Sequence, residues 1–353
     1  MIERNAMAPD SADPAEVAVS EETLVLAIET SCDETSVAIV RGGDHVLSNV
    51  VSSQIELHAE FGGVVPEVAS RAHLELLEPV VEAALAEAGT TPEQLDAVAA
   101  THGPGLIGAL LVGVSAAKAL AVAWNTPYVG VNHMEGHLFA TFLERPDLQP
   151  PLVVLLVSGG HTMLVEVRAK GQYRILGSTT DDAAGEAFDK VARYLGLGYP
   201  GGPLIDELAC EGDRESIPFP RGLLNEGLDF SFSGMKTAVI NYVRKHPEAT
   251  NADLAASFQE AVVDVLVTKA LRAAHQVGAR AVCLGGGVAA NRRLRERFAD
   301  EAREAGLDCL VPSRHYCTDN AAMIAAAATW RLANDGPTAL DGGAYPSLVL
   351  PAS

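Results

Sequence analysis

The chain contains the stretch Leu152-Val153-Val154-Leu155-Leu156-Val157, followed by the polar turn Ser158-Gly159-Gly160-His161-Thr162 and a second apolar run at 163–167. Apolar runs separated by a short glycine-containing turn are typical of a buried β-hairpin. The same pattern occurs near the start, where apolar residues 24–28 and 37–40 flank a polar turn. In both places a third strand follows, and then helices alternate with strands. The sequence therefore predicts an internal duplication into two α/β lobes, each a mixed sheet covered by helices.

The boundary between the lobes is expected at residues 144–151, which contain three prolines. The expected divisions are a disordered acidic extension at 1–22, an N-terminal lobe at 23–145, a C-terminal lobe at 146–335 and a tail at 336–353. In such a duplication the two hairpin turns face each other, so we expect them in one cleft between the lobes.

The composition is that of a globular protein, with 353 residues, 48% hydrophobic and 20% charged. A formal net charge of −21 argues against broad, non-specific affinity for nucleic acid. The five cysteines form no CxxC pair, which fits a reducing cytoplasm better than a disulfide framework. The first twenty residues lack the apolar core of a signal peptide. The apolar run 106–124 contains Gly108, Gly113 and Lys118, so we interpret it as a buried helix and expect no membrane span.

A pair of histidines, His133 and His137, opens a helix after a short apolar strand. Side chains four residues apart lie on one face of a helix, so both rings can reach one cation. Zinc peptidases share this spacing but have Glu directly after the first His, where this chain has Met134, and Glu135 lies off the shared face. Hydrogen-bonded histidines are an equally good interpretation of the pair alone. Asp319, before the last helix, is either an N-cap or a third ligand for Fe(II) or Zn(II).

Two glycine-rich turns are candidate binding sites for an anion. Ser158-Gly159-Gly160 exposes backbone N–H groups without side-chain obstruction, and an ordinary hairpin turn is the alternative. Gly285-Gly286-Gly287 lies between a buried strand and a helix whose N-terminus favours anionic groups. Glycine at such a place also serves close packing. Asn291, in the following helix, could reach a ribose or a base.

Other polar residues have two interpretations each. Asp189 and Asp206 follow glycine-containing turns and could hold sugar hydroxyls, but helix caps or ion pairs explain them equally well from spacing alone. Residues 231–236 form a polar loop, with Ser233 as its cap, to which we assign no chemistry. A cluster of arginines beside the glycine run is either a local basic patch or a solvated helix face. It consists of Arg292, Arg293, Arg295 and Arg297.

Taken together, eight motifs over residues 23–335 closely resemble the tRNA N6-adenosine threonylcarbamoyltransferase family in its bacterial form. In chain order they are Glu29-Thr30-Ser31-Cys32-Asp33-Glu34-Thr35, His133-Met134-Glu135-Gly136-His137, Leu156-Val157-Ser158-Gly159-Gly160-His161-Thr162, Asp181-Asp182-Ala183-Ala184-Gly185-Glu186-Ala187-Phe188-Asp189-Lys190, Tyr199-Pro200-Gly201-Gly202-Pro203, Phe230-Ser231-Phe232-Ser233-Gly234-Met235-Lys236-Thr237, Gly285-Gly286-Gly287-Val288 with Asn291-Arg292, and Cys317-Thr318-Asp319-Asn320.

The resemblance implies the duplicated fold of actin, Hsp70 and sugar kinases, with a cleft between the lobes. It also implies transfer of the threonylcarbamoyl group from threonylcarbamoyl-AMP to N6 of the adenosine 3′ to the anticodon, in tRNAs that read codons beginning with A. The family's metal ligands correspond to His133, His137 and Asp319, with one iron expected and zinc as the alternative.

The resemblance carries further roles onto individual residues. The expected substrate contacts are Leu156, Val157, Ser158, Gly159, Gly160, Asp189, Gly202, Asp206 and Asn291, with the adenosine part of the donor at Gly285, Gly286 and Gly287. The position of Asp206 varies within the family, so its contact is the least secure. Asp33, Glu34 and His161 correspond to positions important for activity, and Asp33 or Glu34 is the candidate proton acceptor.

Bacterial members of this family act with a catalytically silent paralogue and a small ATPase. We therefore expect both as partners, with tRNA as the substrate and no membrane. Three other functions compete: a sugar-kinase-like or chaperone-like ATPase of the same fold, a metallopeptidase, and a non-catalytic scaffold. Met134 disfavours the peptidase, and the presence of all three metal ligands disfavours the scaffold.

Overall fold

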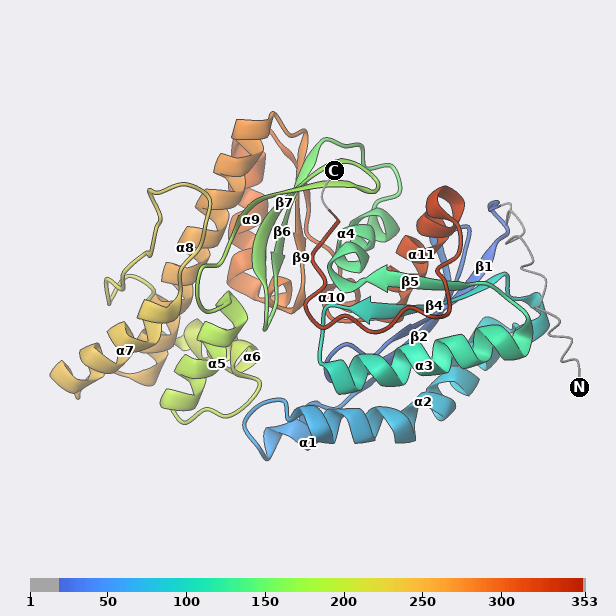
Figure 1. Ribbon diagram of the computed structural model, residues 1–353. Helices are drawn as coiled ribbons and strands as arrows, with labels where there is room; N and C mark the ends of the chain where they lie inside the picture. Colours follow the sequence, from blue (N-terminus) through green and yellow to red (C-terminus); the bar gives the residue numbers. More distant parts are fainter. Residues whose placement is uncertain (1–18, 352–353) are drawn as a thin grey trace, which may run out of the picture.

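Two five-stranded mixed sheets form the frame of the protein in a computed structural model that describes residues 19–351 (Figure 1). The first sheet has the order β3-β2-β1-β4-β5 and the second the order β10-β9-β6-β7-β8. In each sheet an antiparallel three-stranded meander continues into two parallel strands. Strand for strand, the second sheet repeats the first, so the duplication predicted from the two hairpins is confirmed.

The strands of the first sheet are β1 (Leu24–Glu29), β2 (Glu34–Arg41), β3 (His45–Ser53), β4 (Ala97–Gly103) and β5 (Tyr128–Asn132). Those of the second sheet are β6 (Leu152–Val157), β7 (Thr162–Ala169), β8 (Gln172–Ser178), β9 (Ala281–Gly285) and β10 (Asp308–Leu310). Every residue of β6 is buried, as its continuous apolar sequence predicts for a central strand.

The helices before β6 are α1 (Ile55–Ala59), α2 (Pro66–Ala88), α3 (Ile107–Trp124) and α4 (His133–Glu144). The later ones are α5 (Ala184–Tyr194), α6 (Gly201–Leu208), α7 (Ser233–Lys245), α8 (Asn251–Val277), α9 (Arg292–Glu304), α10 (Arg314–Cys317) and α11 (Ala321–Asp335). Three short 3₁₀ turns are η1 (Pro92–Gln94), η2 (Ala209–Glu211) and η3 (Gly287–Ala290). α2 runs as one helix through Pro79.

A shared core joins the lobes. Apolar side chains of β1, β4 and β5 belong to the same buried cluster as those of β6, β9, α4 and α11. The outer face of the first sheet packs against α2 and α3, and that of the second against α5, α8 and α9. The helix that carries both histidines, α4, therefore lies in the middle of the molecule.

The last helix crosses back to the first lobe. α11 contacts β1, β2 and β5 as well as α4, although the expected boundary grouped it with the second lobe. Its Ala-rich sequence is buried on nearly all sides, so it needs two surfaces to pack against and finds them in the first sheet and α4. The tail continues across this lobe, where the Thr338 amide donates to the Tyr128 carbonyl and the Tyr345 amide to the His102 carbonyl, both at 2.7 Å.

One helix among residues 19–351, α3, is long and apolar enough to cross a membrane by length and composition, and a third of its span is buried. It packs against β4 and α2, but Ile107, Leu111 and Val122 remain exposed. The expected buried helix is therefore a covering helix with an apolar outer face. Residues 1–18 of the expected disordered extension lie outside the described residues.

Candidate functional site

The histidine helix begins at a defined residue. Strand β5 ends at Asn132, whose side-chain oxygen accepts hydrogen bonds from the amides of Met134 at 2.9 Å and Glu135 at 3.3 Å. An Asn at this position satisfies N–H groups that have no partner within the helix. The cap sets α4 to start at His133, and its first turn brings His137 above His133.

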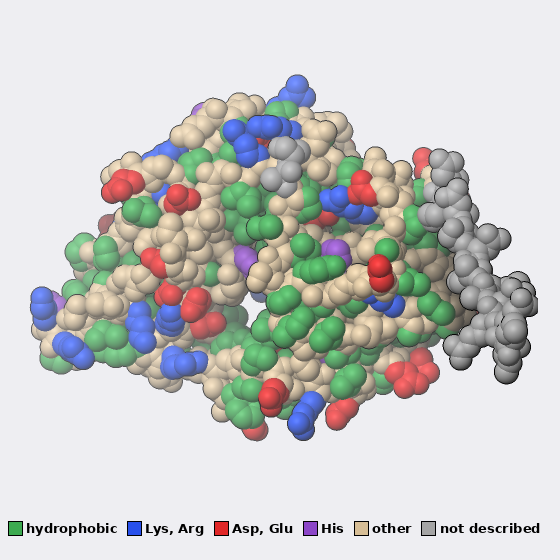
Figure 2. Space-filling model, viewed as in Figure 1, with side chains coloured by type: hydrophobic (Ala, Val, Ile, Leu, Met, Phe, Trp, Pro, Cys, Tyr) green, Lys and Arg blue, Asp and Glu red, His purple; other side chains and the backbone are tan. Residues whose placement is uncertain are grey.

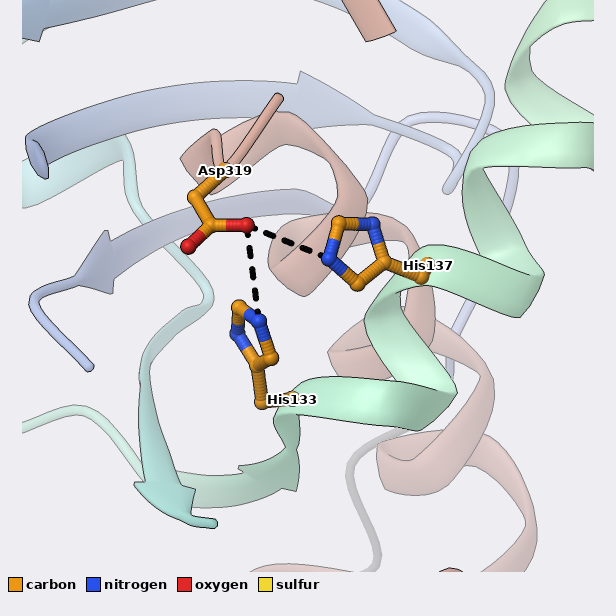
Figure 3. A group of neighbouring side chains, drawn as sticks. All are labelled: His133, His137 and Asp319. Carbon is orange, nitrogen blue, oxygen red and sulfur yellow. Dashed lines mark hydrogen bonds and ion pairs between the residues drawn. The ribbon is translucent and has the colours of Figure 1, made fainter. Parts of the chain in front are cut away.

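The two imidazoles converge on one carboxylate oxygen (Figure 3). Nε2 of His137 lies 3.1 Å and Nε2 of His133 lies 3.5 Å from Oδ1 of Asp319. The ligand atoms of the three residues all lie within 4.8 Å of one another, and both histidines are buried. Asp319 comes from the segment where the chain returns from the second sheet to α11. Two imidazole nitrogens and one carboxylate oxygen suit a divalent cation such as Fe(II) or Zn(II).

A fourth residue orients this group, and the sequence analysis did not assign it a role. Glu29 ends β1, is fully buried, and its Oε2 lies 2.9 Å from Nδ1 of His133. The same carboxylate accepts hydrogen bonds from the Ser31 amide and the Thr101 hydroxyl, both at 2.5 Å. A carboxylate on Nδ1 leaves Nε2 free for a cation. The signal in the sequence was a glutamate at the end of an otherwise apolar strand.

The charges of the group depend on one another. Burial opposes ionisation of Glu29 and Asp319, but the adjacent His133 holds the pKa of both carboxyls below the usual range. Burial likewise disfavours charge on His133, but Asp319 and Glu29 raise the pKa of its imidazole well above the usual value. Without a cation, the positive charge of a protonated His133 imidazole lies between the two carboxylates and balances them. A bound divalent cation can supply this positive charge instead.

Glu135, the alternative acid of a peptidase, lies elsewhere. Its carboxylate is buried and accepts hydrogen bonds from the guanidinium of Arg331 at 2.9 Å and from the hydroxyl of Tyr173 at 3.0 Å. It joins α4 to α11 and does not face the metal group. The geometry agrees with the interpretation that Met134 removes the peptidase function.

The two glycine turns lie side by side. A Cβ on Gly286 would meet the carbonyl oxygen of Val157 at 2.5 Å, so the loop after β9 passes directly against the end of β6. Gly286 also has a φ of +85°, a conformation that side chains rarely adopt. A Cβ added to Gly159, Gly160 or Gly287 would meet no atom within 4 Å, so the backbone of these three residues faces open space. Together they leave room for a ligand to approach backbone N–H groups.

His73 forms two hydrogen bonds to the acidic turn that follows β1. Nε2 of His73 donates to the Cys32 carbonyl at 3.0 Å, and its Nδ1 accepts from the Thr35 hydroxyl at 2.8 Å. These bonds bracket Asp33 and Glu34. Burial, followed by the charges of Asp319 and Asp33, raises the pKa of the Glu34 carboxyl well above its usual value.

His161 belongs to the opposite turn. Its amide donates to the Ser158 hydroxyl at 3.1 Å, and its carbonyl accepts from the Ser158 amide at 2.8 Å. Burial and the nearby charge of His133 lower the pKa of its imidazole to about 4. His161 is therefore neutral at physiological pH, and its ring can both donate and accept a hydrogen bond.

The remaining predicted contacts already have partners within the protein. Asp189 accepts from the Gly201 amide at 2.7 Å, next to Gly202, which is open to a ligand. Asp206 pairs with the guanidinium of Arg292 at 2.8 Å. Asn291 caps α9 by accepting from the Leu294 amide and donates to the Gln259 side chain at 2.6 Å. For these three residues the structural roles weighed in the sequence analysis are present, and their substrate contacts stay predictions.

The arginine cluster is not a free basic patch. Arg293 and Arg297 pair with Glu260 at 2.7 and 3.1 Å, and Arg297 also pairs with Asp264. Arg295 donates to two backbone carbonyls, and Arg292 pairs with Asp206. Three of the four guanidinium groups pair with carboxylates and Arg295 bonds to backbone carbonyls, so the cluster is not the patch of free cations that the basic-patch interpretation requires.

Comparisons with known proteins agree with this arrangement. A family model described as tRNA N6-adenosine threonylcarbamoyltransferase matches residues 45–326. A curated protein of that name from Clostridium botulinum (strain Kyoto / Type A2) is 52% identical over 337 residues, which cover 94% of this chain and 99% of the relative. The protein of the same name from Clostridium perfringens (strain 13 / Type A) is 52% identical over 335 residues, with the same coverage.

Solved structures share the fold at low sequence identity. Full-length HypF in its phosphate- and nucleotide-bound form aligns with a TM-score of 0.62 at 14% identity, covering 92% of this chain and 48% of HypF. Component A of the (R)-2-hydroxyglutaryl-CoA dehydratase of Acidaminococcus fermentans aligns with a TM-score of 0.53 at 16% identity, covering 88% of this chain and 99% of that chain. The fold class predicted from the sequence, two lobes of the actin, Hsp70 and sugar-kinase type, is confirmed.

Proposed function

The chain belongs to the tRNA N6-adenosine threonylcarbamoyltransferase family, and from this premise we propose that it transfers the threonylcarbamoyl group of threonylcarbamoyl-AMP to N6 of the adenosine 3′ to the anticodon. The substrates would be tRNAs that read codons beginning with A. The observation that carries the proposal is 52% identity over 94% of the chain to relatives of that name. The group of His133, His137 and Asp319 beside two open glycine turns supports it.

The same three residues are proposed to hold one divalent metal, with Fe(II) first and Zn(II) second. Their donor set suits both metals, and Glu29 orients His133 for either. When bound, such a metal would act as a Lewis acid on the donor. Metal analysis of protein purified without oxygen, using His137→Ala as the control, should find one iron per chain in the unaltered protein only.

The two glycine turns are proposed to hold the activated donor. The open space beside Gly159 and Gly160 would let anionic oxygens reach their backbone N–H groups, and the Gly285–Gly287 loop would lie against the adenosine. Because the N6 amine of adenine is a weak nucleophile, donors aimed at the developing negative charge should contribute strongly to the rate. The neutral imidazole of His161 lies beside this turn and can donate a further hydrogen bond.

Asp33 is proposed to accept the proton that the N6 amine releases. The choice against Glu34 rests on burial and neighbouring carboxylates, which raise the pKa of the Glu34 carboxyl and so favour its neutral form. Asp33 is held at the end of a turn that His73 fixes, and the charge of Asp33 acts on Tyr199 and Asp189 of the second lobe. It therefore faces the side of the cleft where the donor would bind.

A direct assay tests the proposed activity. Purified protein, threonylcarbamoyl-AMP and unmodified tRNA would be mixed, and the nucleosides analysed by mass spectrometry. We expect threonylcarbamoyladenosine with the unaltered protein and none with Asp319→Ala. Absence of the modified nucleoside with and without partner proteins would defeat the proposal, and steady ATP turnover without tRNA would favour the ATPase instead.

A catalytically silent paralogue and a small ATPase are the proposed protein partners, in the cytoplasm. An apolar groove of about 430 Å³ between α2 and α3 supports a docking surface, since it is lined by Leu74, Leu77 and Leu111. Leu74 is 68% and Leu111 48% exposed, and Figure 2 shows hydrophobic side chains gathered over these helices. Leu111→Glu should abolish co-purification with a partner while leaving the fold intact.

A further inference from the structure

A helix with no assigned role carries an unusual charge pattern. The chain has 46 acidic and 25 basic residues, yet α7 contains Lys236, Arg244 and Lys245 and no Asp or Glu. Its apolar residues face inward, with Met235 and Val239 buried. The outward side, called here the α7 face, consists of exposed polar residues, namely Ser233, Lys236, Thr237, Asn241, Arg244 and Lys245.

The cations of the α7 face have no acidic partner in the described part of the chain. No carboxylate of residues 19–351 lies within 4.0 Å of the charged groups of Lys236, Arg244 or Lys245. On neighbouring α5, by contrast, Lys190 pairs with Asp182 at 2.7 Å and Glu186 at 3.0 Å. Arg292, Arg293 and Arg297 of α9 also pair with carboxylates. The charge of the α7 face is thus available to an anionic partner.

The α7 face begins at the edge of the cleft. Strand β8 runs parallel to β6, so its end at Ser178 lies at the same sheet edge as the Ser158 turn. The Asp181 carboxylate then accepts from the Phe232 amide and the Ser233 hydroxyl, both at 2.8 Å, and fixes the first turn of α7 to that edge. From there α7 runs outward past α5 (Figure 1), and Figure 2 shows basic side chains in this part of the surface.

We propose that the α7 face binds the sugar-phosphate backbone of the tRNA anticodon stem while the target adenosine enters the cleft. The inference rests on the proposed function and assigns a surface to its substrate. Lys245 lies nine positions after Lys236, about 14 Å along a helix, so the three cations can contact separate phosphates of one strand. Lysine and arginine bind phosphates, and the side chains of Thr237 and Asn241 can bond phosphate oxygens and 2′-hydroxyls. Such contacts read no sequence, as an enzyme for several tRNAs requires.

Two triple variants with equal charge loss test the proposal. The first is Lys236→Gln, Arg244→Gln and Lys245→Gln in the full-length chain. The matched control is Lys170→Gln, Arg280→Gln and Arg303→Gln, whose exposed cations lie at the opposite edge of the second sheet. Affinity for unmodified tRNA would be measured across a range of salt concentrations, and affinity for threonylcarbamoyl-AMP in parallel.

The α7 variant should bind tRNA at least about tenfold more weakly. In a plot of log affinity against log salt concentration, the slope of this variant should be smaller in magnitude by about 2–3, which is about one unit for each lost phosphate contact. Donor affinity should be unchanged, and the control should bind tRNA like the unaltered protein. The proposal that the α7 face binds tRNA is overturned if the α7 variant keeps its tRNA affinity, or if both variants lose tRNA affinity equally. If the unaltered protein modifies no tRNA, the proposed function itself fails.

Discussion

At the scale of single residues, Glu29 is expected to influence the proposed metal site strongly, because it contacts the ring of one proposed ligand. It fixes the ring of His133, whereas Nδ1 of His137 is buried without a hydrogen-bond partner among the described residues. Glu29→Gln removes the charge but keeps the shape, and metal affinity should fall by about 10–100-fold. Competition with a chelator of known affinity measures this. Glu135→Gln, an equally buried carboxylate on α4 that faces Arg331, should leave metal affinity unchanged. Equal metal affinity of Glu29→Gln and the unaltered protein would contradict the assigned role.

At the scale of secondary-structure elements, the packing of α5 against the Ser158 turn fixes the position of the turn that is proposed to bind the donor. A Cβ on Gly185 would meet the Ser158 carbonyl oxygen at 2.5 Å and the Gly159 Cα at 2.8 Å. Both are backbone atoms, so they cannot move aside by a side-chain rotation. Gly185→Ala should therefore displace the turn, weaken donor binding by about 10–100-fold and cost about 1–3 kcal/mol of stability. Isothermal titration with a non-hydrolysable donor analogue checks the first effect. Glu186→Ala, on the next and exposed residue, is the control, and normal donor binding by Gly185→Ala would refute the packing argument.

The docked C-terminal tail provides a pH-dependent prediction at the same scale. The ring of His102 contacts Tyr345 edge-on, and burial, with the charges of Lys118 and Arg331, lowers the pKa of His102 to about 4. Since an unfolded His titrates near about 6.5, the unfolded chain binds the extra proton first as the pH falls. Stability is therefore fully present above about pH 6.5 and is lost between there and pH 4. The loss at pH 5 should be about 2 kcal/mol. Denaturant unfolding at pH 7 and 5 should show a smaller difference in His102→Asn, and an identical difference would refute the assignment.

At the scale of the whole molecule, the sequence was sufficient to predict the features that depend on local residue patterns. Apolar runs and glycine turns predicted the strands and the duplication, and His133 with His137 predicted one metal-binding helix face. What failed depended on partners distant in the chain. Arg293 and Arg297 of α9 pair with Glu260 and Asp264 on α8. Glu29 contacts His133, which lies 104 positions later in the chain. No local spacing encodes such pairs, because they arise only when the sheets bring separate strands and helices together.

The metal group should also stabilise the entire fold, because it joins α4 to a segment 182 positions later in the chain. A ligand bound only by the folded state adds about 2.7 kcal/mol at a hundredfold excess over its Kd. For a chain of 353 residues this corresponds to a rise in Tm of about 4 °C. Scanning calorimetry of the metal-loaded protein, with and without a chelator, should show that difference. The His137→Ala variant should have the same Tm with and without the chelator, since it lacks one of the proposed metal ligands. A Tm of the unaltered protein that does not respond to the chelator would contradict the site, because a metal bound by two buried histidines and Asp319 of the folded chain should stabilise that fold.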